Sequence, residues 1–462
     1  MAAELPPSLI NSLQTATGFH EATFRDVHQT GAQVISVRIN PAKLDSPLQV
    51  PYLKEILAEK IPWNKHGYYL TERPLFTVDP LFHAGAYYVQ KASSMFLEEA
   101  LRQACDTTKY MQVLDLCAAP GGKSTLIQAV ITTGSLLVSN EVIRARAGIL
   151  AENITKWGAA NVVVTNNDPR DFKKLPSFFD CIVVDAPCSG SGLFRKDPEA
   201  INEWSLNNVA LCSQRQQRIL ADVYDSLKPD GILIYSTCSY SREEDEDISD
   251  WLKDNYDVAS MRLELKTEWG IVETISATHH CYGYRFYPDK LKGEGFFIAL
   301  FRKGDSTAPS LKEKKPAAKN LLPSGGEEKT ARAFLAGDHR FSFLKWQNEI
   351  LAVPSAIFDA VLQVQQTMYI KKAGINMGSI IRDELIPSHE LVLSTAASGI
   401  LPEAAVEAAM ALDYLRRKDI HIDTEKRGWV VISYNNIALG LVKILPNRIN
   451  NYYPKDWRIL NK

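Results

Sequence analysis

Two cysteines stand in similar polar settings and are the first candidates for chemistry. Cys188 lies in DAPCSGSG and Cys238 lies in YSTCSYS, and each follows an apolar run closely. A buried cysteine usually acts as a small hydrophobe, and Cys181 and Cys212 fit that role. Loops rich in serine and glycine give a thiol little apolar surface to pack on, so Cys188 and Cys238 are interpreted as reactive.

A thiol of this kind suits covalent catalysis on a pyrimidine. Addition of a thiolate to carbon 6 turns carbon 5 into a nucleophile that can attack an activated methyl group. Asp185, at the end of the run before Cys188, could hold a proton near N3 of a cytosine. A second thiolate could remove the proton from carbon 5. The thiolate is the reactive form, so a lowered pKa is needed, and the residue types leave open which cysteine plays which part.

The segment 111–125, MQVLDLCAAPGGKST, is predicted to form a strand, a glycine turn and the start of a helix. Such a turn lies where open α/β sheets bind ligands. A phosphate-binding P-loop would need glycine at position 117, which is Cys117, and no G-x-G-x-x-G fingerprint is present. The turn therefore predicts a ligand loop for something other than ATP or NAD, with a plain strand-to-helix turn as the alternative.

The surrounding pattern predicts an α/β fold with a doubly wound parallel sheet. Several of the apolar runs are continuous, as expected for strands covered on both faces. The runs lie at 112–116, 135–140, 161–166, 180–186, 231–238 and 295–301, with helical patterns at 142–157, 207–227 and 243–253.

Acidic residues come at the ends of successive predicted strands. Glu141 follows the second strand, Asp168 lies past the third, and Asp185 ends the fourth. Each alone could be a helix cap or a turn residue. Together they describe one crevice that suits a nucleoside without phosphate, because a carboxylate can accept hydrogen bonds from ribose hydroxyls.

Three motifs resemble those of the Nol/Nop/Sun family of RNA cytosine-5 methyltransferases. They are LDLCAAPGGKS, VVDAPCSGSGLFRKDP and IYSTCSYSREEDE, in this order. The resemblance implies a Rossmann-like class I methyltransferase sheet, with S-adenosyl-L-methionine as the cofactor. It also implies that Cys238 is the nucleophile and that Cys188 assists product release. The residues alone could not give this order, because DNA cytosine methyltransferases use a Pro-Cys thiol as the nucleophile.

The same resemblance implies a binding role for the residues around the glycine turn. Glu141 would bind the ribose of the cofactor, Asp168 its adenine end, and Asp185 would lie between cofactor and target base. Lys196 in FRKDP fits a place near RNA phosphate, although a surface lysine is the commoner case. The methionine part of the cofactor would be surrounded by Cys117, Ala118, Ala119, Pro120, Gly121, Gly122 and Lys123.

The segments outside the motifs predict four divisions of the chain. Residues 1–100 would be an N-terminal α+β RNA-facing domain, 101–303 the methyltransferase domain, 304–330 a flexible linker rich in Pro, Gly, Ser, Lys and Glu, and 331–462 a C-terminal RNA-binding domain. SVRIN and YYVQKASSM resemble the N-terminal segment of the family, and YRFYPDKLKGEGFFIALFRK resembles the end of its catalytic domain. Arg38 and Asn40 in SVRIN either serve RNA or solvate a sheet edge.

The C-terminal part combines a predicted helix, LPEAAVEAAMALDYL, with a strand pair, RGWVVISYNNIALGLVKIL, that turns at YNN. Its arrangement resembles the small-subunit ribosomal RNA methyltransferase F branch, which is PUA-like in this part. The tail suits RNA through charge and base stacking, or is an aromatic tail that packs on the protein. Its residues of interest are Arg448, Lys455, Arg458, Lys462, Tyr452, Tyr453 and Trp457.

Composition narrows the possible settings. The net charge is −2, so an RNA-binding surface must be a local patch. No apolar run approaches the roughly 20 residues of a membrane helix, and no signal peptide is visible. Seven scattered cysteines do not suggest a disulfide framework, and the ligand pattern of a structural metal site is lacking.

We therefore expect a cytoplasmic, monomeric enzyme with no metal and no membrane association. It would methylate carbon 5 of a cytosine in RNA, with small-subunit (16S) ribosomal RNA as the expected substrate, which it could meet within a ribosomal particle. The alternatives are the same chemistry on transfer RNA, or a non-catalytic RNA-binding factor of ribosome assembly that keeps the fold.

Overall fold

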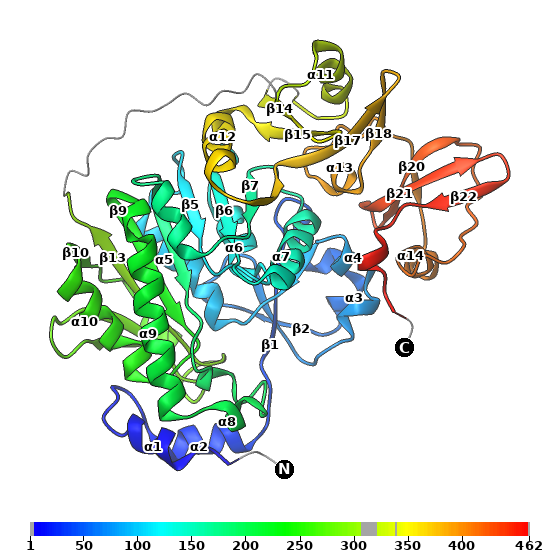
Figure 1. The fold of residues 1–462 in the computed structure, drawn as a ribbon. Helices are drawn as coiled ribbons and strands as arrows, with labels where there is room; N and C mark the ends of the chain where they lie inside the picture. Colours follow the sequence, from blue (N-terminus) through cyan, green and yellow to red (C-terminus); the bar gives the residue numbers. More distant parts are fainter. Residues whose placement is uncertain (1–3, 306–320, 338–339, 461–462) are drawn as a thin grey trace.

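A central sheet organises the computed structural model, which describes residues 4–305, 321–337 and 340–460. Within these residues, ten strands form one sheet (Figure 1). Its parallel part runs in the order β7-β6-β5-β8-β9. These strands are β5 (Gln112–Asp115), β6 (Leu136–Asn140), β7 (Val162–Thr165), β8 (Phe179–Asp185) and β9 (Leu227–Thr237), and each falls on a predicted apolar run.

The strand order reverses beside β5. From β5 the chain moves to β6 and β7 on one side, then returns to place β8 and β9 on the other. In open α/β sheets, ligands bind outside the carboxyl ends of the strands at such a switch point. The glycine turn after β5 and the cysteine loops after β8 and β9 therefore open toward one crevice.

The prediction of a wholly parallel sheet is wrong at both edges. β13 (Phe296–Lys303), the last predicted run, pairs antiparallel with β9, and β12 (Tyr282–Phe286) and β11 (Val272–Ile275) continue antiparallel beyond it. β10 (Val258–Ser260) pairs with β13, and β16 (Ile370–Ala373) pairs antiparallel with β7. A continuous apolar run indicates a buried strand but carries no information about its direction.

Both faces of the sheet are apolar because successive side chains of a strand point to opposite sides. Val113 joins the cluster on one face and Leu114 the cluster on the other. Three helices cover the first face: α5 (Leu97–Ala104), α6 (Gly122–Val130) and α7 (Arg144–Trp157). The second face is covered by α9 (Leu206–Val223), α10 (Glu246–Asn255) and α12 (Phe358–Thr367).

The N-terminal region packs on the catalytic part in two places. The helices α1 (Pro7–Leu13) and α2 (Glu21–Gln29) share an apolar cluster with Tyr240 and Tyr287. A small antiparallel sheet follows in the order β2-β3-β1-β4. Its strands are β1 (Ile35–Ile39), β2 (Leu57–Lys60), β3 (Gly67–Leu70) and β4 (Tyr87–Val89), accompanied by α3 (Pro51–Lys54) and α4 (Pro80–His83).

Arg38 and Asn40 are structural, which corrects both predicted roles. Arg38 is 1% exposed and donates hydrogen bonds to Gln90 and to Thr125 in α6. Asn40 is buried, and its side chain donates to the carbonyl groups of Gly85 and Trp157. Both therefore join the N-terminal sheet to helices of the catalytic part rather than face solvent or RNA.

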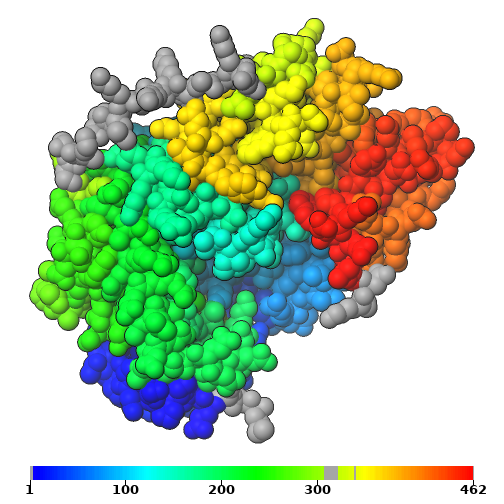
Figure 2. Space-filling model, viewed as in Figure 1, coloured from blue at the N-terminus to red at the C-terminus, as the bar shows by residue number. Residues whose placement is uncertain are grey.

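The C-terminal region contains two further sheets. The first runs β14-β15-β17-β18 and the second β19-β20-β21-β22. The second shares a hydrophobic cluster with the N-terminal sheet, and Figure 2 shows these two parts of the chain side by side. The strands are β14 (Phe341–Trp346), β15 (Glu349–Pro354), β17 (Ile375–Ile381), β18 (Glu384–Pro387), β19 (Glu403–Ala405), β20 (Gly428–Tyr434), β21 (Ile437–Leu445) and β22 (Arg448–Asn451).

Some local predictions for this region change. The predicted helix over 401–415 is confirmed only as α14 (Ala408–Leu415), because Glu403–Ala405 forms β19. The YNN turn is confirmed: Asn435 and Asn436 both have positive φ and join β20 to β21. Most of the predicted linker, residues 306–320, lies outside the described residues, and 325–330 belong to α11 (Gly325–Arg332).

The remaining helices are α8 (Ala200–Glu203) and α13 (His389–Leu393). Among the described residues, no helix combines the length and apolar character needed to cross a membrane.

Candidate active site

The two predicted cysteines face each other. β8 and β9 are adjacent parallel strands, and the loops that follow them bring the Sγ atoms of Cys188 and Cys238 to 3.1 Å. Both thiols are free and partly buried. Cys181 and Cys212 are buried as predicted, at 0% and 4% exposure.

The surroundings of the pair favour ionisation of one sulfur only. A hydrogen bond from Cys188 lowers the pKa of Cys238 against the opposing effect of burial, and Lys91 and Lys123 lower it further. The same hydrogen bond, together with burial, raises the pKa of Cys188 well above its usual value. Either sulfur could donate the hydrogen bond at this distance, but the opposite pKa shifts make Cys238 the more readily ionised thiol of the pair.

A close backbone approach holds the two cysteine loops together. The amide of Gly192 donates to the carbonyl of Cys238 at 2.8 Å, and Ser191 Oγ accepts from the amide of Tyr240 at 2.9 Å. A Cβ at Gly192 would lie 2.7 Å from the Gly295 carbonyl oxygen and 2.8 Å from that of Cys238. Glycine is therefore required in DAPCSGSG for steric reasons.

The glycine turn is fixed from outside by α7. Gly121 has φ of +116° and occupies the N-cap position of α6, a conformation that glycine adopts without steric cost. Asn153 donates to the carbonyl of Pro120 at 2.7 Å, and Arg146 donates to that of Ala119 at 2.8 Å. The turn is thus held rigid before any ligand arrives.

Asp115 is a site residue that the sequence reasoning missed. Its carboxyl is fully buried and accepts a hydrogen bond from Ser124 Oγ at 2.6 Å, whereas its Oδ1 has no partner among the described residues. Burial raises the pKa of Asp115 to about 7. A buried polar atom without a partner at the carboxyl end of β5 marks a place where a polar ligand group fits.

Lys123 and Asp185 connect the glycine turn to the end of β8. Lys123 Nζ lies 2.7 Å from Asp185 Oδ2, and Ser236 Oγ donates to Asp185 Oδ1 at 2.9 Å. The lysine side chain is 14% exposed and also lies over the ring of Phe296. The carboxylate is therefore held in one orientation, facing the crevice.

Glu141 and Asp168 lie at the ends of β6 and β7, as expected. Glu141 is 3% exposed, accepts from the amide of Ile143 and lies 3.6 Å from Arg146. Asp168 caps the turn that follows it by accepting from the amide of Arg170 at 3.1 Å. A cap role for Asp168 is thus present, whatever else the residue binds.

A cavity of about 270 Å³ joins most of the predicted site. The glycine turn, Asp185 and Cys238 line it, whereas Gly121, Glu141, Asp168 and Cys188 are not part of its lining as described. Lys91, Ser93 and Ser94 from the N-terminal region close it on another side, and Lys196 lies at its wall. In the described part of the chain, neither Lys91 nor Lys196 has an ion-pair partner.

Two of the missed residues could not have been singled out from the sequence. Lys91 stands in VQKASSM, and nothing in that segment shows that it reaches a cavity formed by later strands. Glu244 lies within a run of acidic residues, and only the packing distinguishes it from its neighbours. In the structure, Glu244 is fully buried and bonded to both cysteine loops.

Fold and site together define a Rossmann-like methyltransferase: a switch-point glycine turn, an acid after the next strand, and an antiparallel β13 beside β9. Family models support this along the chain. The model described as "16S rRNA methyltransferase RsmB/F" matches residues 103–302. Those for the N-terminal domain and the PUA domain of RsmF match residues 5–92 and 402–459.

Full-length relatives agree with these matches. The chain is 32% identical to ribosomal RNA small subunit methyltransferase F of Psychromonas ingrahamii, over 86% of this chain and 84% of the relative. It is 30% identical to the protein of the same name from Pectobacterium atrosepticum, over 91% and 89%. The chain therefore belongs to the RsmB/F family, and it is an S-adenosylmethionine-dependent RNA methyltransferase.

Solved structures give the same picture for the catalytic part. A methyltransferase homolog protein from Pyrococcus horikoshii is 30% identical with a TM-score of 0.51, covering 65% of this chain and 100% of that one. NSun6 from the same organism shares the fold, with 19% identity and a TM-score of 0.53 over 64% of this chain and 98% of its own.

Proposed function

We propose that this protein methylates carbon 5 of a cytosine in 16S ribosomal RNA, with Cys238 as the nucleophile. The observation that carries the proposal is the cysteine pair. Two thiols in hydrogen-bond contact at 3.1 Å, one of them with a lowered pKa, supply both the nucleophile for addition to carbon 6 and a second sulfur for the later release. The relatives named ribosomal RNA small subunit methyltransferase F support the choice of RNA.

In the first step, the Cys238 thiolate forms a bond to carbon 6 of the cytosine. Electron density moves toward N3 and carbon 5, and N3 takes a proton that the Lys123 ammonium passes on through Asp185, which Lys123 and Ser236 orient. Carbon 5 is then able to take a methyl group. When the double bond re-forms later, N3 gives this proton back to the Asp185–Lys123 pair.

Release follows from the change that the first step makes at Cys188. In the free enzyme, the hydrogen bond with Cys238 and the charge of Cys238 both keep the pKa of Cys188 high. Once Cys238 is bonded to carbon 6, its sulfur has lost that charge and accepts hydrogen bonds poorly. Both effects on the Cys188 proton are then removed. Cys188 can then lose its own proton to solvent and, as a thiolate, remove the proton from carbon 5. The electrons of that C–H bond re-form the double bond between carbons 5 and 6, and Cys238 leaves as a thiolate.

The residues of the glycine turn fit S-adenosylmethionine. Cys117 to Lys123 would surround its methionine part, Glu141 would bind the ribose, Asp168 the adenine end, and Asp185 would separate it from the base. The unpartnered Oδ1 of Asp115 and the cavity beside Cys238 support this assignment. When bound, the cofactor supplies an electrophilic methyl group.

The proposal extends to the RNA-binding regions and to the setting. Lys91 and Lys196 would approach phosphates beside the target base, with residues 1–100 and 331–462 as RNA-binding domains around the methyltransferase domain at 101–303. In the tail, Arg448, Lys455 and Tyr452 are exposed and available, whereas Tyr453 is 1% exposed and packs inside; Lys462 lies outside the described residues. We place the enzyme in the cytoplasm as a monomer acting on ribosomal RNA or a ribosomal particle.

The test is transfer of a labelled methyl group from S-adenosylmethionine to total RNA, followed by mapping of 5-methylcytosine. Label in small-subunit ribosomal RNA is expected. Label confined to transfer RNA would show that transfer RNA, rather than ribosomal RNA, is the substrate. If neither naked RNA nor ribosomal particles became labelled, the enzymatic role would be contradicted.

A further inference from the structure

Glu244 is a buried carboxylate that contacts the loops of both cysteines. Its Oε2 accepts hydrogen bonds from Ser189 Oγ at 2.5 Å and from Ser239 Oγ at 2.6 Å. Ser189 is the residue after Cys188, and Ser239 is the residue after Cys238. One carboxylate oxygen therefore sets the distance between two loops that come from different strands.

The second carboxylate oxygen of Glu244, Oε1, accepts hydrogen bonds on the side of the Cys188 loop. Oε1 accepts from the amide of Ser189 at 2.8 Å and from Gln216 Nε2 at 3.2 Å. Gln216, on α9, also donates to the carbonyl of Pro187 at 3.1 Å, so the residues before and after Cys188 are both held. Burial raises the pKa of Glu244, and the hydrogen bonds from Ser189, Ser239 and Gln216 oppose that rise because they stabilise the ionised carboxylate.

The charges around the two sulfurs are arranged asymmetrically. The hydrogen bond with Cys238 and burial raise the pKa of Cys188 most, and the nearby carboxylate of Glu244 raises it further. Cys238 is faced by two cations, Lys91 and Lys123, and by Asp185. A negative charge beside one thiol and positive charges beside the other favour a thiolate at the second.

We propose that Glu244 is the positioning residue of the cysteine pair and decides which sulfur is the nucleophile. It holds the loops so that Cys188 donates to Cys238, and its charge keeps the proton on Cys188. The catalytic part of this inference rests on the proposed function. The effect of Glu244 on the two thiols does not require RNA or cofactor.

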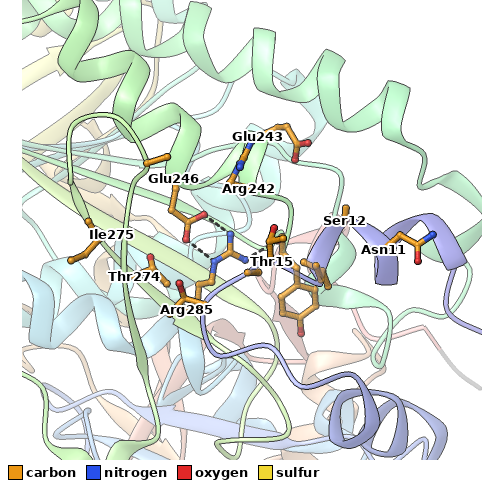
Figure 3. Close-up of a pocket in the computed structure, with 14 residues that line it drawn as sticks. Asn11, Ser12, Thr15, Arg242, Glu243, Glu246, Thr274, Ile275 and Arg285 are labelled. Carbon is orange, nitrogen blue, oxygen red and sulfur yellow. Dashed lines mark hydrogen bonds and ion pairs between the residues drawn. The ribbon is translucent and has the colours of Figure 1, made fainter.

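The neighbouring Glu243 provides a matched control. Its side chain is exposed and lines a separate polar cavity of about 460 Å³ between the N-terminal helix and the catalytic part. Figure 3 shows this cavity, in which Glu246 binds Arg285 and Glu243 points away from them. Removing the charge of Glu243 changes the net charge equally, without touching either serine.

The first experiment measures thiol reactivity in the full-length protein without ligands. Brief alkylation with iodoacetamide across a pH series, followed by peptide mass spectrometry, gives the labelled fraction of each cysteine. In the wild type and in Glu243→Gln, Cys238 should be labelled first and at lower pH. In Glu244→Gln, the preference for Cys238 should disappear. A folded Glu244→Gln variant with the wild-type labelling profile would overturn the proposal.

The second experiment separates position from charge and remains informative if Glu244→Gln fails to fold. Ser189→Ala/Ser239→Ala removes both hydroxyl links but keeps the carboxylate. We expect kcat for methyl transfer to fall on the order of 100-fold, because small displacements of reacting groups have such effects, with KM for the cofactor unchanged. An unchanged kcat would overturn the positioning role. A wild type that methylates no RNA would refute the proposed function instead, while the labelling profile still tests Glu244.

Discussion

Cys188 and Cys238 face each other with their sulfur atoms 3.1 Å apart, although 50 residues separate them in the chain. At that distance one proton lies between two sulfurs, and the groups around the pair decide which sulfur keeps it. The catalytic assignment therefore depends on an asymmetry that can be measured, and the following predictions start from it.

Replacing Cys238 by alanine should abolish methyl transfer. We expect the rate to fall by more than roughly 1,000-fold, because the covalent route loses its nucleophile. Binding of S-adenosylmethionine, measured by calorimetry, should stay near the wild-type value, since the glycine turn is held by α7 rather than by Cys238. Substantial residual methylation would show that the nucleophile is assigned to the wrong cysteine.

Replacing Cys188 by alanine should trap the protein on RNA. Addition and methyl transfer would still occur, but the base that removes the carbon-5 proton would be missing. A slowly migrating protein–RNA band on denaturing gels is the expected result with RNA and cofactor present. The double variant Cys188→Ala/Cys238→Ala should form no such band, and absence of the band in the single variant would refute the release role.

Replacing Asp185 by asparagine should lower kcat by roughly 100- to 10,000-fold, the usual range for a general acid or base. Asparagine keeps the hydrogen bond from Ser236 but cannot share a proton near N3, and it loses the ion pair with Lys123. Steady-state kinetics with labelled cofactor would measure the effect. A variant with altered KM and unchanged kcat would mean that Asp185 only binds.

Asp115 should make stability depend on pH. Its pKa is raised from 3.8 to about 7 in the folded protein, so the folded state holds a proton that the unfolded chain has lost. Stability from this group is therefore complete below about pH 4 and is lost as the pH rises through about 7. Over that window the loss is at most about 4 kcal/mol.

Urea unfolding of the cofactor-free protein at pH 5 and pH 8 would test this. The difference between the two pH values should be smaller in Asp115→Asn than in the wild type, because asparagine does not titrate. An equal difference in both proteins would show that Asp115 ionises normally.

Gly192→Ala should disturb the cysteine loops. The new Cβ would lie within 3 Å of the carbonyl oxygens of Gly295 and Cys238, and the overpacked site should cost about 1–3 kcal/mol and reduce methyl transfer. Gly148→Ala in α7 is the control: nothing lies within 4 Å of its Cβ, so that variant should be as stable as the wild type or up to about 1 kcal/mol more stable. Thermal unfolding distinguishes the two.

Much of the fold follows from short-range patterns. Continuous apolar runs located all six predicted strands of the central sheet, since a buried strand needs apolar residues on both faces. The glycine turn and the two cysteine loops could be placed after particular strands for the same reason. Side-chain periodicity is a local property of the chain, so it can be recognised without knowing which strands pair with each other.

Other features depend on residues that are distant in the chain, and only the tertiary structure decided them. The direction of β13 is set by its pairing with β9, and Arg38 is buried because α6 supplies its acceptor. The sequence determined that each of the two thiols follows a buried strand. The pKa shifts of the two thiols depend on their mutual hydrogen bond and on Lys91, Lys123 and Glu244, because electrostatic effects act across space between segments that only folding brings together.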